Sequence, residues 1–194
     1  MNLKSRYCPG RMVISTFISL LPIIFCDAQE AAKKNDYRFY TTLKTAENPG
    51  YWLNLDTRKE DAQNPGEFFS ATDAKKPYGA GFEYTVPEDL LGKNIRLSFS
   101  AKFRITDSTQ KVLLVINLLH GDSTITWKGL NVSAKSKKVN EWFVVQDSLL
   151  IPRSLPAGTK IKIYLWNEDG KAEADLDDMD VRLLEFQIHR YQDY

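Results

Sequence analysis

The stretch from Ile161 to Phe186, IKIYLWNEDGKAEADLDDMDVRLLEF, holds two kinds of side chain that can do chemistry. It is predicted to form two strands joined by a turn, and in the first strand Tyr164 and Trp166 alternate with apolar residues. Their rings therefore point to the side that water should cover, where a flat aromatic surface can stack on the apolar face of a sugar. The second strand opens with carboxylates, the ligands that a hard cation such as Ca²⁺ prefers: Asp175, Asp177, Asp178 and Asp180.

Asp177 has the same alternation parity as Met179 and Val181, which predicts that its carboxylate points into the core. A buried carboxylate without a partner is costly, so it must accept hydrogen bonds, pair with an arginine or bind a metal ion. The spacing does not match an EF-hand calcium loop, because Met179 takes the fifth position counted from Asp175. After Leu183 the apolar residues change parity, which indicates a bulge or a strand end that is covered on both faces.

The elements that would position these residues are predicted to be short strands. The clearest is NIRLSFSAKFRI, in which every second residue from Ile95 to Ile105 is apolar and the residues between them are polar. Turn signals such as NPG, KKPYG, HGDS, LPAG and NEDG separate further strand-like segments, and only PEDLLG, residues 87–92, has the form of a helical turn. Many short strands without crossover helices predict an all-β domain, an antiparallel two-sheet β-sandwich of the jelly-roll type.

Alternation also predicts which side chains fill the core. The segment KVLLVINLL, residues 111–119, is apolar on both parities, so both of its faces must be covered or its outer face must be sheltered. A jelly roll can shelter the outer face of a sheet when that face is concave. The predicted core residues are Ile95, Leu97, Phe99, Phe103, Ile163, Leu165, Met179 and Val181.

The start of the chain has the pattern of a secretory signal peptide, with basic residues, an apolar run from Met12 to Phe25 and small residues before a cleavage point after Ala28. We expect residues 1–28 to be the signal peptide, 29–36 a short leader and 37–194 the β-sandwich domain, with no transmembrane helix in the mature chain. The protein would be secreted, periplasmic or held at the cell surface. A lipoprotein anchored through Cys26 and a retained N-terminal anchor are the alternatives.

Charge and cysteine content narrow the class of protein. Lys4, Arg6, Arg11 and Asp27 lie in the expected signal peptide, so the 26 basic and 25 acidic residues of the chain become 23 and 24 after cleavage. This balance leaves no basic excess to attract nucleic acid or anionic lipid. Both cysteines also fall in the signal peptide, and a secreted domain without disulfides is more typical of a bacterial envelope than of an animal protein.

The C-terminal half of the chain resembles a known family. Trp142 opens a strand that ends in Leu-Ile-Pro, IKIYLWN follows, and an acidic pair then leads into MDVRLLEF. This pattern resembles the jelly-roll carbohydrate-binding modules of the galactose-binding-domain-like group in secreted bacterial proteins, over roughly residues 67–186. The resemblance implies one structural Ca²⁺, with Asp177 at the matching ligand position. Glu67 is the second suggested ligand, in a region where the sequence departs from the family pattern.

Aromatic side chains are the candidates for glycan contacts, because Tyr and Trp combine a flat apolar body with a polar tip. Packing in or beside the core is the competing interpretation for each ring, and we adopt it for Trp142; Trp52, near a turn, is a further candidate. Lys162 shares the outward parity of two of the rings and could orient a sugar by hydrogen bonds. The expected glycan-binding residues are Trp166, Tyr164, Trp127, Tyr78 and Lys162.

Three functions remain open on these residues. The leading hypothesis is a non-catalytic module that binds a polysaccharide or another glycan; the alternatives are an envelope domain that binds protein and a carbohydrate-active enzyme on a jelly-roll scaffold. The letters HGDS around His120 include those of a nucleophile system, but geometry defines a triad, and we expect His120 and His189 to be solvated. No carboxylate spacing singles out a glycosidase pair.

Overall fold

The computed structural model describes residues 36–44, 50–136 and 138–186, all of which belong to one compact unit, Lys33–Tyr194. These residues form two antiparallel β-sheets, as the alternating sequence pattern predicted. The expected signal peptide, residues 1–28, the leader up to residue 35 and His189 lie outside the described residues. Within the described ranges, no helix has the length and apolar character needed to cross a membrane.

Sheet A has six strands, and sheet B has five. The order in sheet A is β3-β4-β11-β6-β9, with β1 also paired to β11, and its strands are β1 (Asp36–Thr41), β3 (Arg58–Glu60), β4 (Phe68–Thr72), β6 (Ile95–Ile105), β9 (Phe143–Ile151) and β11 (Ala174–Glu185). The order in sheet B is β2-β5-β10-β7-β8, and its strands are β2 (Trp52–Leu53), β5 (Tyr78–Thr85), β7 (Val112–His120), β8 (Ser123–Asn131) and β10 (Lys160–Asn167). Three 3₁₀ turns complete the described elements: η1 (Leu55–Thr57), η2 (Glu88–Leu90) and η3 (Ser133–Lys135).

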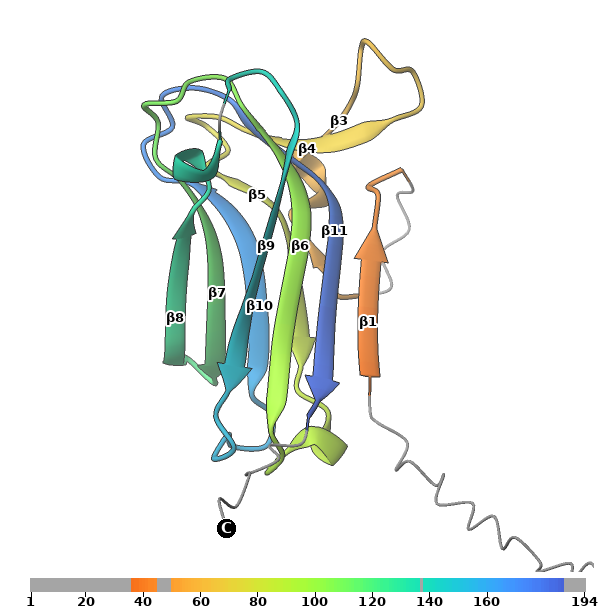
Figure 1. Cartoon of the computed structure of the whole chain (residues 1–194), viewed down its shortest axis with the longest axis vertical. Coiled ribbons are helices and arrows are strands. Elements are labelled where there is room, and N and C mark those ends of the chain that lie inside the picture. Colours follow the sequence, from red (N-terminus) through yellow and green to blue (C-terminus); the bar gives the residue numbers. More distant parts are fainter. Residues whose placement is uncertain (1–35, 45–49, 137, 187–194) are drawn as a thin grey trace, which may run out of the picture. The chain divides into compact units, whose positions relative to one another are not determined.

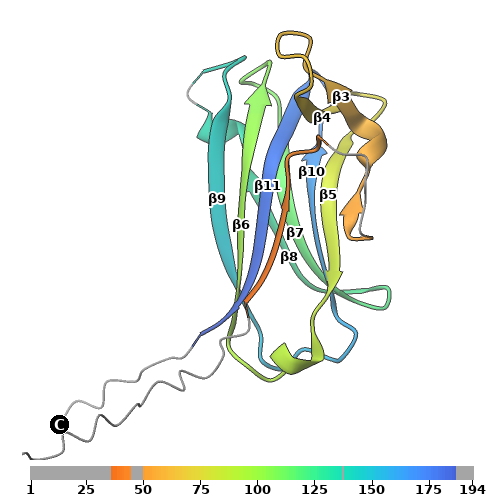
Figure 2. The ribbon, with the colours of Figure 1, turned by 90° about the vertical axis from the view of Figure 1, so that its right-hand side faces the viewer.

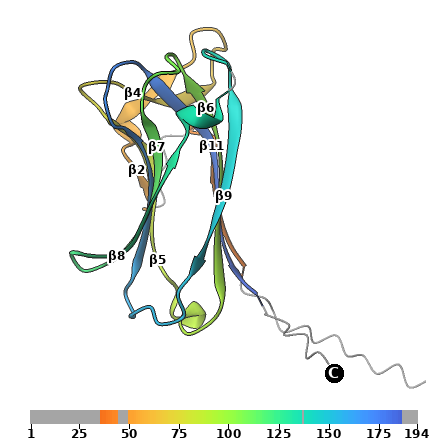
Figure 3. The same cartoon turned by 60° about the vertical axis from the view of Figure 1, so that its left-hand side comes forward.

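The order in which the chain visits these sheets is that of a jelly roll. From β4 to β11 every connection passes from one sheet to the other, except the β7–β8 hairpin (Figure 1). The resulting strand orders, β4-β11-β6-β9 and β5-β10-β7-β8, are those of two interleaved Greek keys. Strands β10 and β11, which follow each other in the sequence, therefore lie in opposite sheets (Figure 3). The aromatic rings of β10 and the aspartates of β11 consequently belong to different faces of the sandwich.

The core lies between the two sheets and is filled by the residues that alternation predicted. All eight predicted core side chains are at most 2% exposed. Strand β6 shows the pattern most regularly, with every second residue from Ile95 to Ile105 buried. This packing fixes which face of each strand points to solvent, and so it also determines the position of the outward-facing rings.

Strand β7 is buried on both faces, as its sequence required. Leu114, Ile116 and Leu118 point into the core, whereas Leu113 and Val115 lie on the outer face of sheet B, opposite Trp166 and Tyr164 in the register. Val115 is nevertheless 0% exposed. Other side chains of sheet B must therefore cover the outer face at this point.

Strand β11 contains a bulge that corrects the prediction for Asp177. Leu176 and Met179 are both 0% exposed although three positions apart, because the register with β6 shifts between Asp177 and Asp180 and Asp178 has a positive φ of 50°. Asp177 pairs with Lys102 on the outer face of sheet A and does not point into the core. The bulge thus precedes the point after Leu183 at which the sequence had suggested one, and the pairing with β6 runs without a shift from Asp180 to Glu185.

Candidate functional site

Four aromatic side chains gather on the outer face of sheet B. Trp166 and Tyr164 come from the central strand β10, and the register places Tyr78 of β5 directly opposite Trp166. The fourth ring comes from β8, on the other side of β7 (Figure 1). We call this set the aromatic platform: Tyr78, Trp127, Tyr164 and Trp166.

The rings of the platform contact one another. Tyr78 and Trp166 are stacked, with ring centroids 6.3 Å apart and planes inclined by 21°. Tyr78 and Tyr164 meet edge to face at 5.9 Å. Tyr78 and Trp127 are 49% and 50% exposed, so the platform keeps large apolar surfaces in contact with water. Exposed rings that are already fixed by neighbours suit the binding of a flat, partly apolar ligand.

Trp127 is connected to the other rings across β7. Its indole, whose N–H can only donate, lies close enough to the Tyr164 hydroxyl to affect the pKa of that group. Burial is the main cause that raises the pKa of Tyr164, and the neighbouring indole opposes it. The two side chains meet over Val115, which lies between Tyr164 and Gly129 in the register. They therefore explain why an outer-face valine is fully buried.

Polar side chains border the platform on one side. Lys162 precedes Tyr164 on the same face, with its Nζ 5.9 Å from the Tyr164 ring centroid and 4.0 Å from Glu83. Its cross-strand neighbour Asn117 lies on the outer face of β7, between Lys162 and Trp127. Asn117 Oδ1 is buried and has no hydrogen-bond partner among the described residues. An amine and an amide beside stacked rings are the groups that can orient sugar hydroxyls.

The structure brings together all five residues expected to bind a glycan: Trp166, Tyr164, Trp127, Tyr78 and Lys162. Trp52 is different, because it is 5% exposed and packs on Phe82 in the core. Trp142 packs on Phe69, as the competing interpretation proposed, and stays partly exposed. Sequence reasoning missed Asn117 and Gly129. The signal for Gly129 was its place two residues after Trp127, which puts both on the same face of a strand.

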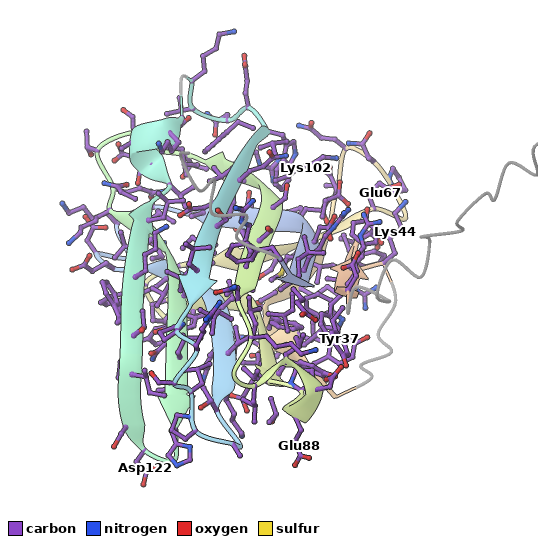
Figure 4. The ribbon with its side chains drawn as sticks, turned by 60° about the horizontal axis from the view of Figure 1, so that its bottom comes forward. Tyr37, Lys44, Glu67, Glu88, Lys102 and Asp122 are labelled. Atoms are coloured by element: carbon purple, nitrogen blue, oxygen red, sulfur yellow. The ribbon has the colours of Figure 1, made fainter. Side chains whose placement is uncertain are left out.

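Asp177 and Glu67, the two suggested calcium ligands, line a small hollow. Its volume is about 220 Å³, and it is bordered by Asp61, Asn64, Glu67, Phe68, Phe69, Lys102, Trp142 and Asp177. Burial raises the pKa of Asp177 to about 6, although its carboxylate accepts a hydrogen bond of 2.7 Å from the Asp178 N–H. Figure 4 shows Lys44, Glu67 and Lys102 close together on this side of the unit.

Lysines pair with carboxylates in and beside this hollow. Glu67 is paired with Lys44 at 2.6 Å, and Lys102 is paired with Asp178 at 2.5 Å. Within residues 36–44, 50–136 and 138–186, no three His, Cys, Asp or Glu side chains are grouped to bind a metal ion. The lining carboxylates Asp61, Glu67 and Asp177 are of the type that Ca²⁺ prefers, but Lys44 holds Glu67.

Another hollow lies on the outer face of sheet A, which Figure 2 shows in full view, with β9, β6, β11 and β1 side by side. Its volume is about 590 Å³. Its polar lining residues include serines, Gln146, Asp147 and the ion pair of Asp180 with Arg182. The only aromatic residue of its lining is Phe99, whose ring is in the core.

Comparisons with known proteins give likenesses in structure alone, since neither a protein family nor a curated protein matches the sequence. The CBM22-1 xylan-binding domain of Paenibacillus barcinonensis Xyn10C is 18% identical with a TM-score of 0.47, over 77% of this chain and 95% of that one. A family 16 carbohydrate-binding module is 12% identical with a TM-score of 0.41, over 59% and 76%. A Stig cyclase from Fischerella sp. TAU is 14% identical with a TM-score of 0.42, over 79% and 77%. Likenesses at this level assign neither a ligand nor an activity to this chain.

Proposed function

We propose that this protein is a non-catalytic glycan-binding module that holds a polysaccharide on the aromatic platform of sheet B. The observation that carries the proposal is the convergence of Tyr78, Tyr164, Trp166 and Trp127 from three strands on one outer face. A protein gains little by exposing such rings to water unless they meet a partner. Their arrangement provides an apolar surface with polar groups at one border, which matches the two faces of a sugar ring.

The expected affinity follows from the size of the contacts. A single aromatic contact of this kind contributes about 0.5–1.5 kcal/mol, so one sugar unit should bind weakly. The platform extends from β5 to β8, across the two strands between them. Affinity should therefore rise with the number of sugar units until the chain covers all the rings.

The proposed location is outside the cytoplasm, where the protein is secreted, periplasmic or held at the cell surface. Its support is the signal-peptide pattern of residues 1–28. A domain with an aromatic platform on one outer sheet face is suited to contact an extended polymer there.

The test is affinity electrophoresis of the mature protein through gels that contain single soluble polysaccharides, neutral and charged. We expect retardation by at least one polymer, reduced in Trp127→Ala and in Trp166→Ala. Tyr40→Ala is the matched control, because Tyr40 is 54% exposed but lies on β1 of the other sheet. This variant should be retarded as strongly as the parent protein.

Two results would overturn the proposal in different ways. Retardation that persists in both tryptophan variants would move the site off the platform, and the polar hollow on sheet A would be the next surface to test with Arg182→Ala. No retardation by any polysaccharide, with the protein folded, would instead favour the envelope domain that binds protein.

A further inference from the structure

The backbone conformation of Gly129 does not require a glycine. It lies inside β8, and its φ is not among the positive values that glycines adopt elsewhere in the described chain. Glycine within a strand is unfavourable, because it adds unfolded-state entropy and contributes no side chain to packing. The usual explanation for such a glycine is that another group approaches the strand closely at that point.

The group that approaches Gly129 is the indole of Trp127. A Cβ added at Gly129 would lie 2.6 Å from Cη2 of Trp127, 3.1 Å from Cζ3 and 3.3 Å from Cζ2. The six-membered ring of the indole thus fills the space where a side chain at this position would begin. It lies along its own strand and reaches towards the Tyr164 hydroxyl, whose pKa it affects.

We infer that Gly129 is a positioning residue for glycan binding, which keeps the Trp127 indole flat against β8 and within reach of the Tyr164 hydroxyl. This inference rests on the proposed function for its consequence in binding, but not for the position of the ring. Any side chain at position 129 would push the indole away from β8 and change its contact with the Tyr164 hydroxyl. The free protein would then hold the ring in several orientations, and binding would have to select one.

Gly129→Ala provides a sharp test, because its effects on stability and on binding should have opposite signs. The nearest atom is the far end of a side chain that can rotate, so alanine should fit without moving the backbone. The free energy of unfolding should be unchanged or higher, since alanine lowers the entropy of the unfolded chain. Affinity for the polysaccharide that retards the parent protein should fall about three- to tenfold, the loss expected for one aromatic contact.

The position of the ring is measured without any glycan. Nitrogen-15 NMR spectra resolve the indole N–H resonance of each tryptophan, and Trp127→Phe identifies that of Trp127. We expect Gly129→Ala and Tyr164→Phe to shift this resonance, because the first displaces the ring and the second removes the hydroxyl beside it. An unchanged Trp127 resonance in Gly129→Ala would overturn the inference, whatever the protein binds.

A double-mutant cycle separates positioning from any direct role of residue 129. If Gly129 acts only through Trp127, Gly129→Ala should weaken binding in the parent protein but have no effect in the Trp127→Ala background. An equal loss in both backgrounds would contradict the inference. If the parent protein binds no polysaccharide, the proposed function fails, while the NMR result still decides whether Gly129 positions the indole.

Discussion

Arg104 donates a hydrogen bond of 2.8 Å from its Nε to the carboxylate of Asp175, its direct neighbour across the pairing of β6 with β11. Asp175 is 1% exposed, and its second carboxylate oxygen has no partner among the described residues. The Arg104 guanidinium also lies 4.8 Å from the ring centroids of both Phe69 and Trp142. These side chains cover one end of sheet A and bury a carboxylate that is only partly compensated.

The first prediction is that the protein becomes more stable as the pH falls from about 7 to about 5. Burial raises the pKa of Asp175 to about 6, well above the value near 3.9 of an unfolded aspartate. The folded state therefore binds a proton that the unfolded state does not, and the free energy of unfolding rises as the proton binds, by an amount on the order of 2 kcal/mol. Urea unfolding at a series of pH values measures this.

The variants Asp175→Asn and Asp177→Asn serve as controls for that pH dependence. Burial raises the pKa of Asp177 to about 6 as well, so each variant should lose part of the rise in stability. The same dependence on pH in the parent protein and in both variants would show that neither carboxylate titrates in this range.

The second prediction concerns the core. Phe99 is 2% exposed on β6, and Phe99→Ala should lower the free energy of unfolding by about 3–5 kcal/mol, because the substitution leaves a cavity. Val144→Ala is the control, since Val144 is 56% exposed and should change stability by less than about 0.5 kcal/mol. Urea unfolding followed by tryptophan fluorescence compares them, and equal stabilities would refute the assigned faces of β6.

The third prediction contrasts two glycines of sheet B. A Cβ at Gly81 would lie 2.5 Å from the backbone oxygen of Ile163, so an alanine there cannot be accommodated by rotating a side chain. Gly81→Ala should destabilise the protein by about 1–3 kcal/mol, whereas Gly129→Ala should not destabilise it. Thermal unfolding of the two variants checks this, and a stable Gly81→Ala variant would mean that β5 and β10 can separate locally.

The fourth prediction tests the calcium hypothesis. If Ca²⁺ binds Asp177 and Glu67 in the folded state alone, a chelator should lower the unfolding temperature and added Ca²⁺ should restore it. Asp177→Asn should abolish this response. An unfolding temperature that changes with neither chelator nor Ca²⁺ would contradict the calcium hypothesis. It would favour the view that Lys44 and Lys102 balance the negative charge around the hollow.

The alternation of apolar and polar residues within single strands predicted much of the fold and of the platform. This pattern depends only on residues that are close in the sequence, so it can be read without the structure. It placed Phe99 and Ile163 in the core and Tyr164 and Trp166 on an outer face. It did not predict which strands pair. The position of Tyr78 opposite Trp166 depends on a register between segments that are distant in the sequence.

Asp177 shows where alternation fails. The prediction that it points inward assumed an unbroken strand, but the bulge between Asp177 and Asp180 inverts the parity of the residues before it. Nothing in the letters ADLDDMDV marks the bulge, because aspartate can adopt the positive φ of Asp178 without a glycine. The sequence also did not predict that β10 and β11 lie in different sheets. A turn between two strands of one sheet and a turn between two sheets can have the same residues.

Strand β11 is the last strand of the described chain, yet it lies in the interior of sheet A, paired with β6 on one side and with β1 and β4 on the other. Until β11 is available, the strands that pair with it, β1, β4 and β6, each have an unpaired edge. Sheet A can close only once Ala174–Glu185 is available to pair, so this topology of long-range strand pairings should fold slowly. A chain shortened before Ala174 would keep the complete strands of the aromatic platform but lose the strand that joins β4 and β1 to β6 in the opposite sheet.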